Sequence, residues 1–314
     1  MKSLYRLFGL CIIAVSVAYF IHFALKHAEE LSGFKWDAAF CANFSVATCL
    51  SVLTVFSGGF AWYLLMRSSA QPVRLAQTVV IFAIAQFAKY IPGNVGHHIG
   101  RVTLAHGYGY KVPIVLFTMV VEAAWLILTA ATLAILALIT GGRTLFIYIP
   151  SIPSVWQLAL AIAVAAMLPL IGYWVLNHWR PGPIKRLFGV ERLNTPTFSV
   201  LLICFTLYLT NLLINGIILS VLSQNLFGAK DSQIWILSGV FAVAWIAGFL
   251  TPGSPAGLGV REAILVTALG SLYGAGVAVG LAISMRAVTI LADGLTFISA
   301  MITRRRFFPV PGAP

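Results

Sequence analysis

The sequence predicts an all-α polytopic membrane protein with about six full spans and two re-entrant helical hairpins, arranged as an inverted-topology repeat. Of its 314 residues, 60% are hydrophobic and only 9% are charged, whereas a soluble domain carries about 25% charged residues. Two apolar runs end in a helix-breaking Pro-Gly pair, and the basic residues concentrate on alternate connecting segments. Because no stretch is long and polar enough for a soluble domain, residues 1–314 are expected to form a single integral membrane domain.

The apolar runs define the expected spans. A helix needs roughly 20 apolar residues to cross a bilayer. Two shorter runs, 74–91 and 233–250, could each be a full span or the first arm of a re-entrant hairpin. The first long run is followed by no clear cleavage site, so it is interpreted as a retained span rather than a signal peptide. The predicted full spans are 4–25, 38–65, 113–140, 155–178, 199–223 and 276–302.

The distribution of charge favours the hairpins. If both short runs return to the side they entered, the cytoplasmic segments hold 13 of the 20 Lys and Arg residues and the outer segments hold four. This matches the positive-inside rule. The model predicts a bacterial inner-membrane location with both termini in the cytoplasm, and it explains the net charge of +12 without a nucleic-acid partner. The cytoplasmic segments are then the N-terminus, 66–74, 101–112, 179–198 and the C-terminus.

The same topology divides the chain into two repeats. Each repeat is predicted to contain two spans, a hairpin and a further span, in that order; the repeats are residues 1–145 and 150–306. The second repeat begins on the opposite side of the membrane. A short tail follows at 307–314. In many secondary transporters with inverted repeats, interrupted segments meet near the bilayer midplane and form the substrate site.

Two matching motifs follow the short runs. Residues 89–101 read KYIPGNVGHHIGR and residues 251–262 read TPGSPAGLGVRE, and each places Pro-Gly nine residues before an Arg. The glycines permit positive φ and leave N–H groups free near a helix start, which favours anion binding, and Arg101 and Arg261 could supply a bidentate phosphate contact. The alternative is that the glycines only allow tight packing and the arginines snorkel to the interface. The predicted substrate-binding residues are Lys89, Gly93, Gly96, His97, His98, Arg101, Gly257, Gly259 and Arg261.

Charged residues near mid-bilayer are candidates for gating or coupling, because a charge there is costly and is usually paired. Glu122 and Arg286 each lie about ten residues into a long span, so they are equivalent in depth. Glu122 is expected to face the bundle interior and Arg286 to have an acidic neighbour. Asp293 lies on the same helical face as Arg286, roughly 10 Å further on. Glu262 either braces Arg261 or acts as a favourable acid in the first turn of the next helix.

No catalytic residue, metal site or cofactor is predicted. The adjacent His97 and His98 are not expected to share a helical face, and the four cysteines lie in apolar runs without metal-ligand spacing. The sequence contains no GxSxG, HExxH or P-loop motif. A transporter is therefore favoured over an enzyme.

At KYIPGNVGHHIGR and at Gly257 to Glu262 the sequence resembles the membrane region of lysylphosphatidylglycerol synthases, a flippase-like family. The resemblance implies a bundle with two re-entrant hairpins that moves a lipid headgroup between leaflets. The two-domain members carry a soluble aminoacyl transferase domain, which is not expected here, so the chain is interpreted as a stand-alone membrane member without synthase activity.

Together these features predict a translocator for an anionic phospholipid or a polyprenyl-phosphate-linked headgroup, with enzymes of cell-envelope synthesis as further expected partners. Two alternatives stay open. One is a membrane-embedded glycosyl transferase, or its non-catalytic partner, in envelope glycolipid synthesis. The other is a scaffold in an envelope-synthesis complex. The sequence leaves the lipid, the energy source and the oligomeric state undetermined.

Overall fold

The computed structural model describes residues 37–69, 71–90, 95–141, 167, 194–229, 233–251 and 255–308. The described residues form helices and connecting turns, with no strand among them. The predicted span 4–25, the predicted span 155–178 apart from Met167, and Gly93 lie outside them. The elements are α2 (Ala38–Ser68), α3 (Leu75–Phe87), η1 (Ala88–Tyr90), α4 (Gly96–Gly107), α5 (Val112–Gly141), α8 (Phe198–Phe227), α9 (Ile234–Leu250), η3 (Pro255–Gly257), α10 (Val260–Tyr273) and α11 (Ala275–Phe307).

Four of these helices, α2, α5, α8 and α11, are long and apolar enough to cross a membrane. The apolar helices that precede the Pro-Gly breaks are shorter, at Leu75–Tyr90 and Ile234–Leu250. Large apolar side chains such as Ile139 and Phe198 are exposed on the outside of the bundle, as expected for a surface in contact with lipid. The fold is therefore that of an all-α polytopic membrane protein, and four of the six predicted spans are confirmed.

Local sequence accounts for where the helices begin and end. The Asp37 carboxylate accepts a hydrogen bond of 2.8 Å from Phe40 N and caps α2. Pro113 lies in the first turn of α5, where its missing N–H costs nothing. Gly228 ends α8 in the left-handed region, with φ +67°, a conformation that favours glycine.

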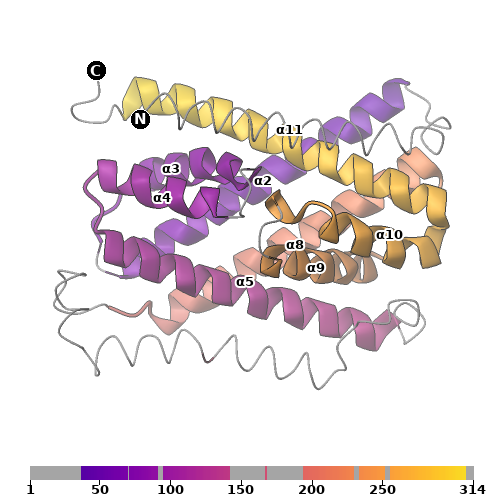
Figure 1. Ribbon diagram of the computed structural model, residues 1–314, viewed down its shortest axis with the longest axis horizontal. Coiled ribbons are helices and arrows are strands. Elements are labelled where there is room, and N and C mark those ends of the chain that lie inside the picture. The colour runs from indigo at the N-terminus through magenta and orange to yellow at the C-terminus, as the bar shows by residue number, and fades with distance from the viewer. Residues whose placement is uncertain are drawn as a thin grey trace.

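The two pairs of short helices enter the bundle from opposite ends (Figure 1). The α3–α4 pair opens at the end where the Tyr108 hydroxyl donates to Phe308 O, at 2.6 Å. The α9–α10 pair finishes at Tyr273, directly before α11 begins. Because the 33 residues of α11 are about 50 Å long, Tyr273 and Phe308 lie at opposite ends. The hairpin topology and the inverted repeat are both present.

The helix contacts follow the repeat. In the first repeat α3 packs on α2 and α4, and in the second α9 packs on α8 and α10. Across the repeats α5 packs on α9 while α11 packs on α3, which are equivalent pairings. Two apolar clusters are centred on the two repeats, but the cluster of the second repeat includes Ala130 and Leu133 of α5 and that of the first includes Ala300 of α11, and a third cluster lies between α2, α5 and α8. The two repeats therefore interlock through their long helices.

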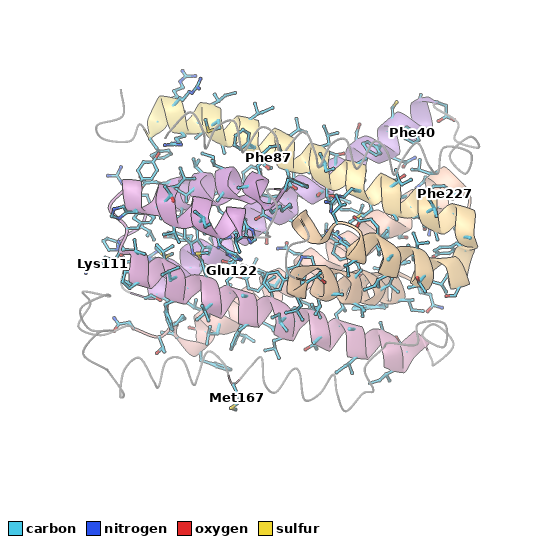
Figure 2. All side chains as sticks on the ribbon, viewed as in Figure 1. Phe40, Phe87, Lys111, Glu122, Met167 and Phe227 are labelled. Carbon is cyan, nitrogen blue, oxygen red and sulfur yellow. The ribbon has the colours of Figure 1, made fainter. Side chains whose placement is uncertain are left out.

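Segments predicted to be cytoplasmic gather at one end of the bundle. Thr197 N donates to the Ser68 hydroxyl at 3.0 Å, and Lys111 N donates to Gln71 Oε1 at 3.2 Å. Figure 2 shows Lys111 at this end and Phe40 and Phe227 at the other. The described basic residues outside the bundle interior lie at the Lys111 end: Arg67, Arg74, Lys111, Arg304, Arg305 and Arg306.

Candidate functional site

A polar cavity of about 220 Å³ lies between the two hairpins and is lined by residues from both repeats. The cavity is smaller than the roughly 300–1,000 Å³ of pockets that enclose whole drug-sized ligands. Its size therefore suits a small group rather than a whole drug-sized molecule. Among the predicted site residues, those that line the cavity are Lys89, His97, His98, Arg101, Glu122, Gly257, Arg261, Arg286 and Asp293.

Arg101 is buried in an ion pair with Glu122. Its two terminal nitrogens lie 2.5 and 3.4 Å from the two carboxylate oxygens, and its guanidinium stacks over the rings of Trp62 and Phe82. Arg101 is 3% exposed and Glu122 is 6% exposed. The prediction that Glu122 faces the interior is confirmed. The assignment of Arg101 to a cytoplasmic segment is wrong, because the hairpin arm continues to Gly107 and holds Arg101 inside the bundle.

Arg101 was expected to contact a phosphate through both terminal nitrogens. In the structure both nitrogens donate to the Glu122 carboxylate instead. A ligand phosphate could reach these nitrogens only by competing with a buried carboxylate. Arg101 therefore lines the cavity as one half of an ion pair.

Arg286 has the acidic neighbour that was predicted. Its Nη1 lies 3.4 Å from Glu262 Oε1 and donates to Ala256 O at 3.1 Å. The other carboxylate oxygen of Glu262 accepts from Gly259 N at 2.7 Å. Glu262 thus acts as the acid in the first turn of α10 and at the same time holds Arg286.

This arrangement corrects the role expected for Gly259. Its N–H was predicted to be free for an anion, but it already donates to Glu262. Gly259 has φ +89° and Gly257 has φ +72°, so both occupy backbone conformations that favour glycine. A Cβ on Gly257 would lie 2.8 Å from the Cα of Gly248, so this glycine also permits close packing of η3 against α9.

Lys89 is paired with Asp293 of α11, at 2.7 Å. Tyr90 donates its hydroxyl to the same oxygen, Asp293 Oδ2, at 2.5 Å. The Lys89 side chain keeps 22% of its surface exposed, whereas Asp293 is almost fully enclosed. Lys89 therefore reaches into the cavity. Asp293 forms its ion pair with Lys89, although Arg286 is much closer to it in sequence.

Arg261 differs from the other three cations. Its guanidinium lies over the ring of Phe241, 4.4 Å from the centroid, and within the described residues no carboxylate forms an ion pair with it. Counted over the described part of the chain, four cations at the cavity (Lys89, Arg101, Arg261 and Arg286) meet three carboxylates (Glu122, Glu262 and Asp293). The cavity has an excess of one positive charge, and it lies at Arg261.

His97 and His98 begin α4 directly after Gly96, and both line the cavity. Their ring centroids lie 3.8 Å apart with the planes tilted by 40°. His97 and His98 are adjacent in α4, so they point in different directions from the helix axis, yet both side chains reach the same cavity. Within the described residues no three His, Cys, Asp or Glu side chains come together as metal ligands.

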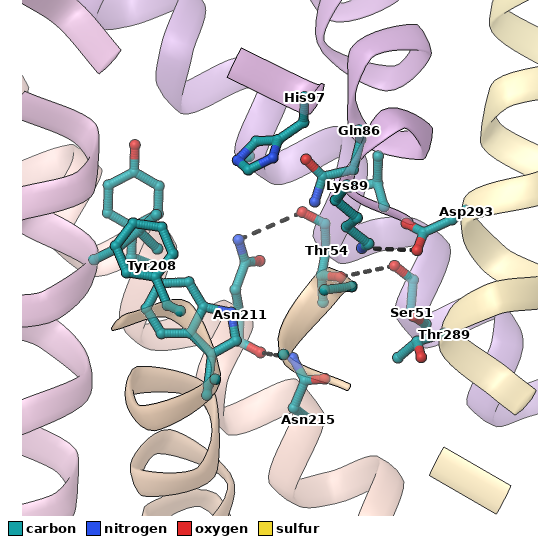
Figure 3. A pocket seen from close by; sticks show the side chains of 18 of the residues that line it. Ser51, Thr54, Gln86, Lys89, His97, Tyr208, Asn211, Asn215, Thr289 and Asp293 are labelled. Carbon is teal, nitrogen blue, oxygen red and sulfur yellow. Dashed lines mark hydrogen bonds and ion pairs between the residues drawn. The ribbon is translucent and has the colours of Figure 1, made fainter. Parts of the chain in front are cut away.

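Several cavity residues were not singled out from the sequence. These are chiefly neutral polar side chains on the long helices, and Figure 3 shows them around the cavity. Asn211 and Asn215 stand four residues apart in the apolar helix α8. Amide pairs of this spacing inside a span are a usable signal, because polar groups there are costly unless they have partners. The residues concerned are Ser51, Thr54, Gln86, Tyr208, Asn211, Asn215 and Thr289.

The lysylphosphatidylglycerol synthase transmembrane-region family model matches residues 6–295. The chain belongs to this family. The match spans both repeats and includes both hairpins. A comparison with curated proteins gives no significant match. Family membership together with the four apolar spans makes the chain a membrane protein of lipid and envelope metabolism.

Proposed function

We propose that the protein translocates an anionic lipid headgroup between the two leaflets of its membrane. The observation that carries the proposal is the cation Arg261, which faces a cavity between two oppositely inserted hairpins without an ion-pair partner among the described residues. A cation in a low-dielectric site strongly favours an anion, and guanidinium suits the oxygens of a phosphate. The lipid tails would remain in the bilayer while the phosphate contacts Arg261.

The inverted repeat supplies a route for the movement. Rocking of one repeat against the other around a central site gives access from alternate sides. In the proposed cycle Glu122, Glu262 and Asp293 hold the other three cations in place, so that the single unpaired guanidinium selects the ligand charge. A glycosyl transferase would instead have to form a glycosidic bond at this site. No feature of the cavity specifically favours that reaction.

The test uses the purified full chain reconstituted in phosphatidylcholine vesicles that contain a few per cent of a labelled anionic lipid. Loss of label accessible to a membrane-impermeant reagent reports movement between leaflets. We expect Arg261→Ala to weaken the apparent affinity about 10- to 100-fold, since a hydrogen bond to a charged group contributes about 1.5–3 kcal/mol. Arg261→Lys should retain part of the activity.

The matched control is Arg67→Ala, which removes an exposed guanidinium bonded to Tyr63 outside the cavity; it should transport like the unaltered protein. Transport by Arg261→Ala at the unaltered rate would exclude Arg261 as the anion contact. No movement of any anionic lipid by folded protein would overturn the proposed function, and a glycosylated product formed without movement would favour the transferase.

A further inference from the structure

A neutral polar face of α8 lines the cavity beside the cationic side chains. Tyr208, Asn211 and Asn215 stand at positions i, i+3 and i+7, so they lie on one face of the helix, and all three line the cavity. Figure 3 shows all three beside the cavity, with the Asn211 side-chain amide donating to the backbone carbonyl of Thr54 from α2, at 3.5 Å. No charged residue belongs to this face of α8.

Two groups on this face are buried without partners. Within the described residues, the Tyr208 hydroxyl and Asn211 Oδ1 make no hydrogen bond, and Tyr208 is only 1% exposed. Buried polar groups nearly always have a hydrogen-bond partner. A group without one has lost its hydrogen bonds to water and gained none from the protein, which destabilises the fold. Neither atom is open to the cavity as it stands, so a ligand supplies the missing partners once these side chains turn toward it.

The chemistry of the face defines that ligand. An amide offers both donors and an acceptor, and a phenol offers one donor and an acceptor, which matches alcohol groups that donate and accept in turn. The Asn215 amide donates to Asn211 O at 2.7 Å, which leaves its carbonyl oxygen available to the cavity. The rings of Trp245 and Phe249 stack at 5.1 Å on another part of the wall, and a sugar or cyclitol has a C–H face that packs against flat aromatic surfaces.

The charges disfavour a head that carries an ammonium group. The cavity already holds one cation more than its carboxylates balance, counted over the described residues. The phosphate of the ligand balances that charge, so an ammonium on the same head would restore one excess positive charge in a low-dielectric site, which is costly. A head with one phosphodiester and several hydroxyls would instead neutralise Arg261 and satisfy the α8 groups.

We propose that Tyr208, Asn211 and Asn215 form a subsite for an uncharged, polyhydroxylated headgroup, such as glycerol, inositol or a hexose, joined to the phosphate that contacts Arg261. This inference rests on the proposed function and specifies its substrate class. The lipid carrying this head is either a glycerophospholipid or a polyprenyl phosphoryl sugar, because the two share the same polar chemistry.

The experiment measures lipid binding to the purified full chain in detergent, independently of transport. The probes are radiolabelled phosphatidylinositol, phosphatidylglycerol and a polyprenyl phosphoryl hexose, together with phosphatidylethanol, whose head carries the phosphodiester but no hydroxyl. Tyr208→Phe removes only the unpartnered hydroxyl and should leave the fold intact. Asn211→Leu is the second variant, and Tyr63→Phe, outside the cavity, is the matched control.

We expect each α8 variant to weaken binding of the hydroxyl-bearing lipids roughly 3- to 10-fold, the effect of one hydrogen bond between neutral groups. Binding of phosphatidylethanol should not change, and the control should bind every probe like the unaltered protein. Whichever hydroxyl-bearing lipid binds most tightly identifies the source of the head.

The subsite is overturned if the folded variants bind all probes as the unaltered protein does, or if all probes weaken equally. It is also overturned if phosphatidylethanol or a lysyl-bearing phosphatidylglycerol binds the unaltered protein as tightly as the hydroxyl-bearing lipids. Selective binding without movement in vesicles would overturn the proposed transport and leave the subsite standing, so the two failures are distinguishable.

Discussion

The two hairpins have the same backbone plan, but their equivalent arginines differ in whether they form an ion pair. Arg101 and Arg261 are equivalent in the repeat, since each follows its Pro-Gly break at the same distance. Arg101 meets Glu122 on the long helix of its repeat, whereas the residue of equivalent depth in the second repeat is another cation, Arg286. Arg101 of the first hairpin is therefore neutralised within its own repeat, and Lys89 is neutralised by Asp293 of the second repeat. Among the described residues this leaves Arg261 of the second hairpin without an ion-pair partner.

The difference shows how a symmetric scaffold can carry an asymmetric site. Inverted repeats allow both hairpins to reach the centre from opposite ends, but among the described residues only one of the two equivalent arginines has an ion-pair partner. If both halves had kept a cation without a carboxylate, two excess charges would lie in one cavity and repel each other. Glu122 therefore determines which of the two equivalent arginines is neutralised.

The largest expected difference is in stability, between Arg101→Ala and Arg261→Ala. Arg101→Ala leaves Glu122 buried without its partner, which costs about 3–5 kcal/mol. Arg261→Ala leaves no carboxylate without its ion pair among the described residues, and it loses a cation–π contact of about 0.5–2 kcal/mol. Thermal unfolding in detergent, followed by tryptophan fluorescence, measures both.

The double variant Arg101→Met with Glu122→Leu serves as the control, because replacing both partners of a buried ion pair by apolar groups is often neutral. It should recover most of the stability that Arg101→Ala loses. Equal melting temperatures for Arg101→Ala and Arg261→Ala would show that the two hairpins do not differ in this way.

A second comparison concerns the backbone of the second hairpin. Gly257→Ala forces a Cβ to 2.8 Å from Gly248 Cα at φ +72°, so it should destabilise the protein by about 1–3 kcal/mol. Gly294→Ala, in α11 with open space around the added Cβ, should be neutral or slightly stabilising. The same unfolding measurement compares the two variants. If Gly257→Ala were as stable as Gly294→Ala, the close approach of η3 to α9 would not be required.

The smallest expected effect comes from Lys89→Met. Asp293 loses its ion pair but keeps the hydrogen bond from Tyr90, so the expected cost is about 1–2 kcal/mol. Lys111→Met removes an exposed amine at the end of the bundle and should change stability by less than about 0.5 kcal/mol. A loss as large as that of Arg101→Ala would mean that Tyr90 alone does not stabilise the Asp293 carboxylate.

Much of the fold could be predicted from the sequence because the bilayer imposes strong rules. Apolar length identified the four observed spans, and the Pro-Gly breaks together with the basic residues identified both hairpins. The interior orientation of Glu122 and the acidic neighbour of Arg286 followed from the cost of an unpaired charge at depth.

The pairing of the charges could not be predicted in the same way. Lys89 and Asp293 are about two hundred residues apart in sequence, and helical rise alone placed Asp293 near Arg286. Only the packing of α3 against α11 brings Lys89 to it. The neutral α8 face was also missed, because a search for charges passes over amides and phenols, although the spacing of Asn211 and Asn215 could have revealed it.

The three ion pairs at the cavity differ in whether they lie within one repeat or connect the two repeats. Arg101–Glu122 lies wholly in the first repeat and Glu262–Arg286 wholly in the second, whereas Lys89–Asp293 connects η1 of the first repeat with α11 of the second. In the proposed rocking movement the first two pairs would stay intact within their repeats, whereas the Lys89 amine and the Asp293 carboxylate would have to separate. Among the described ion pairs, Lys89–Asp293 is the one that connects the two repeats.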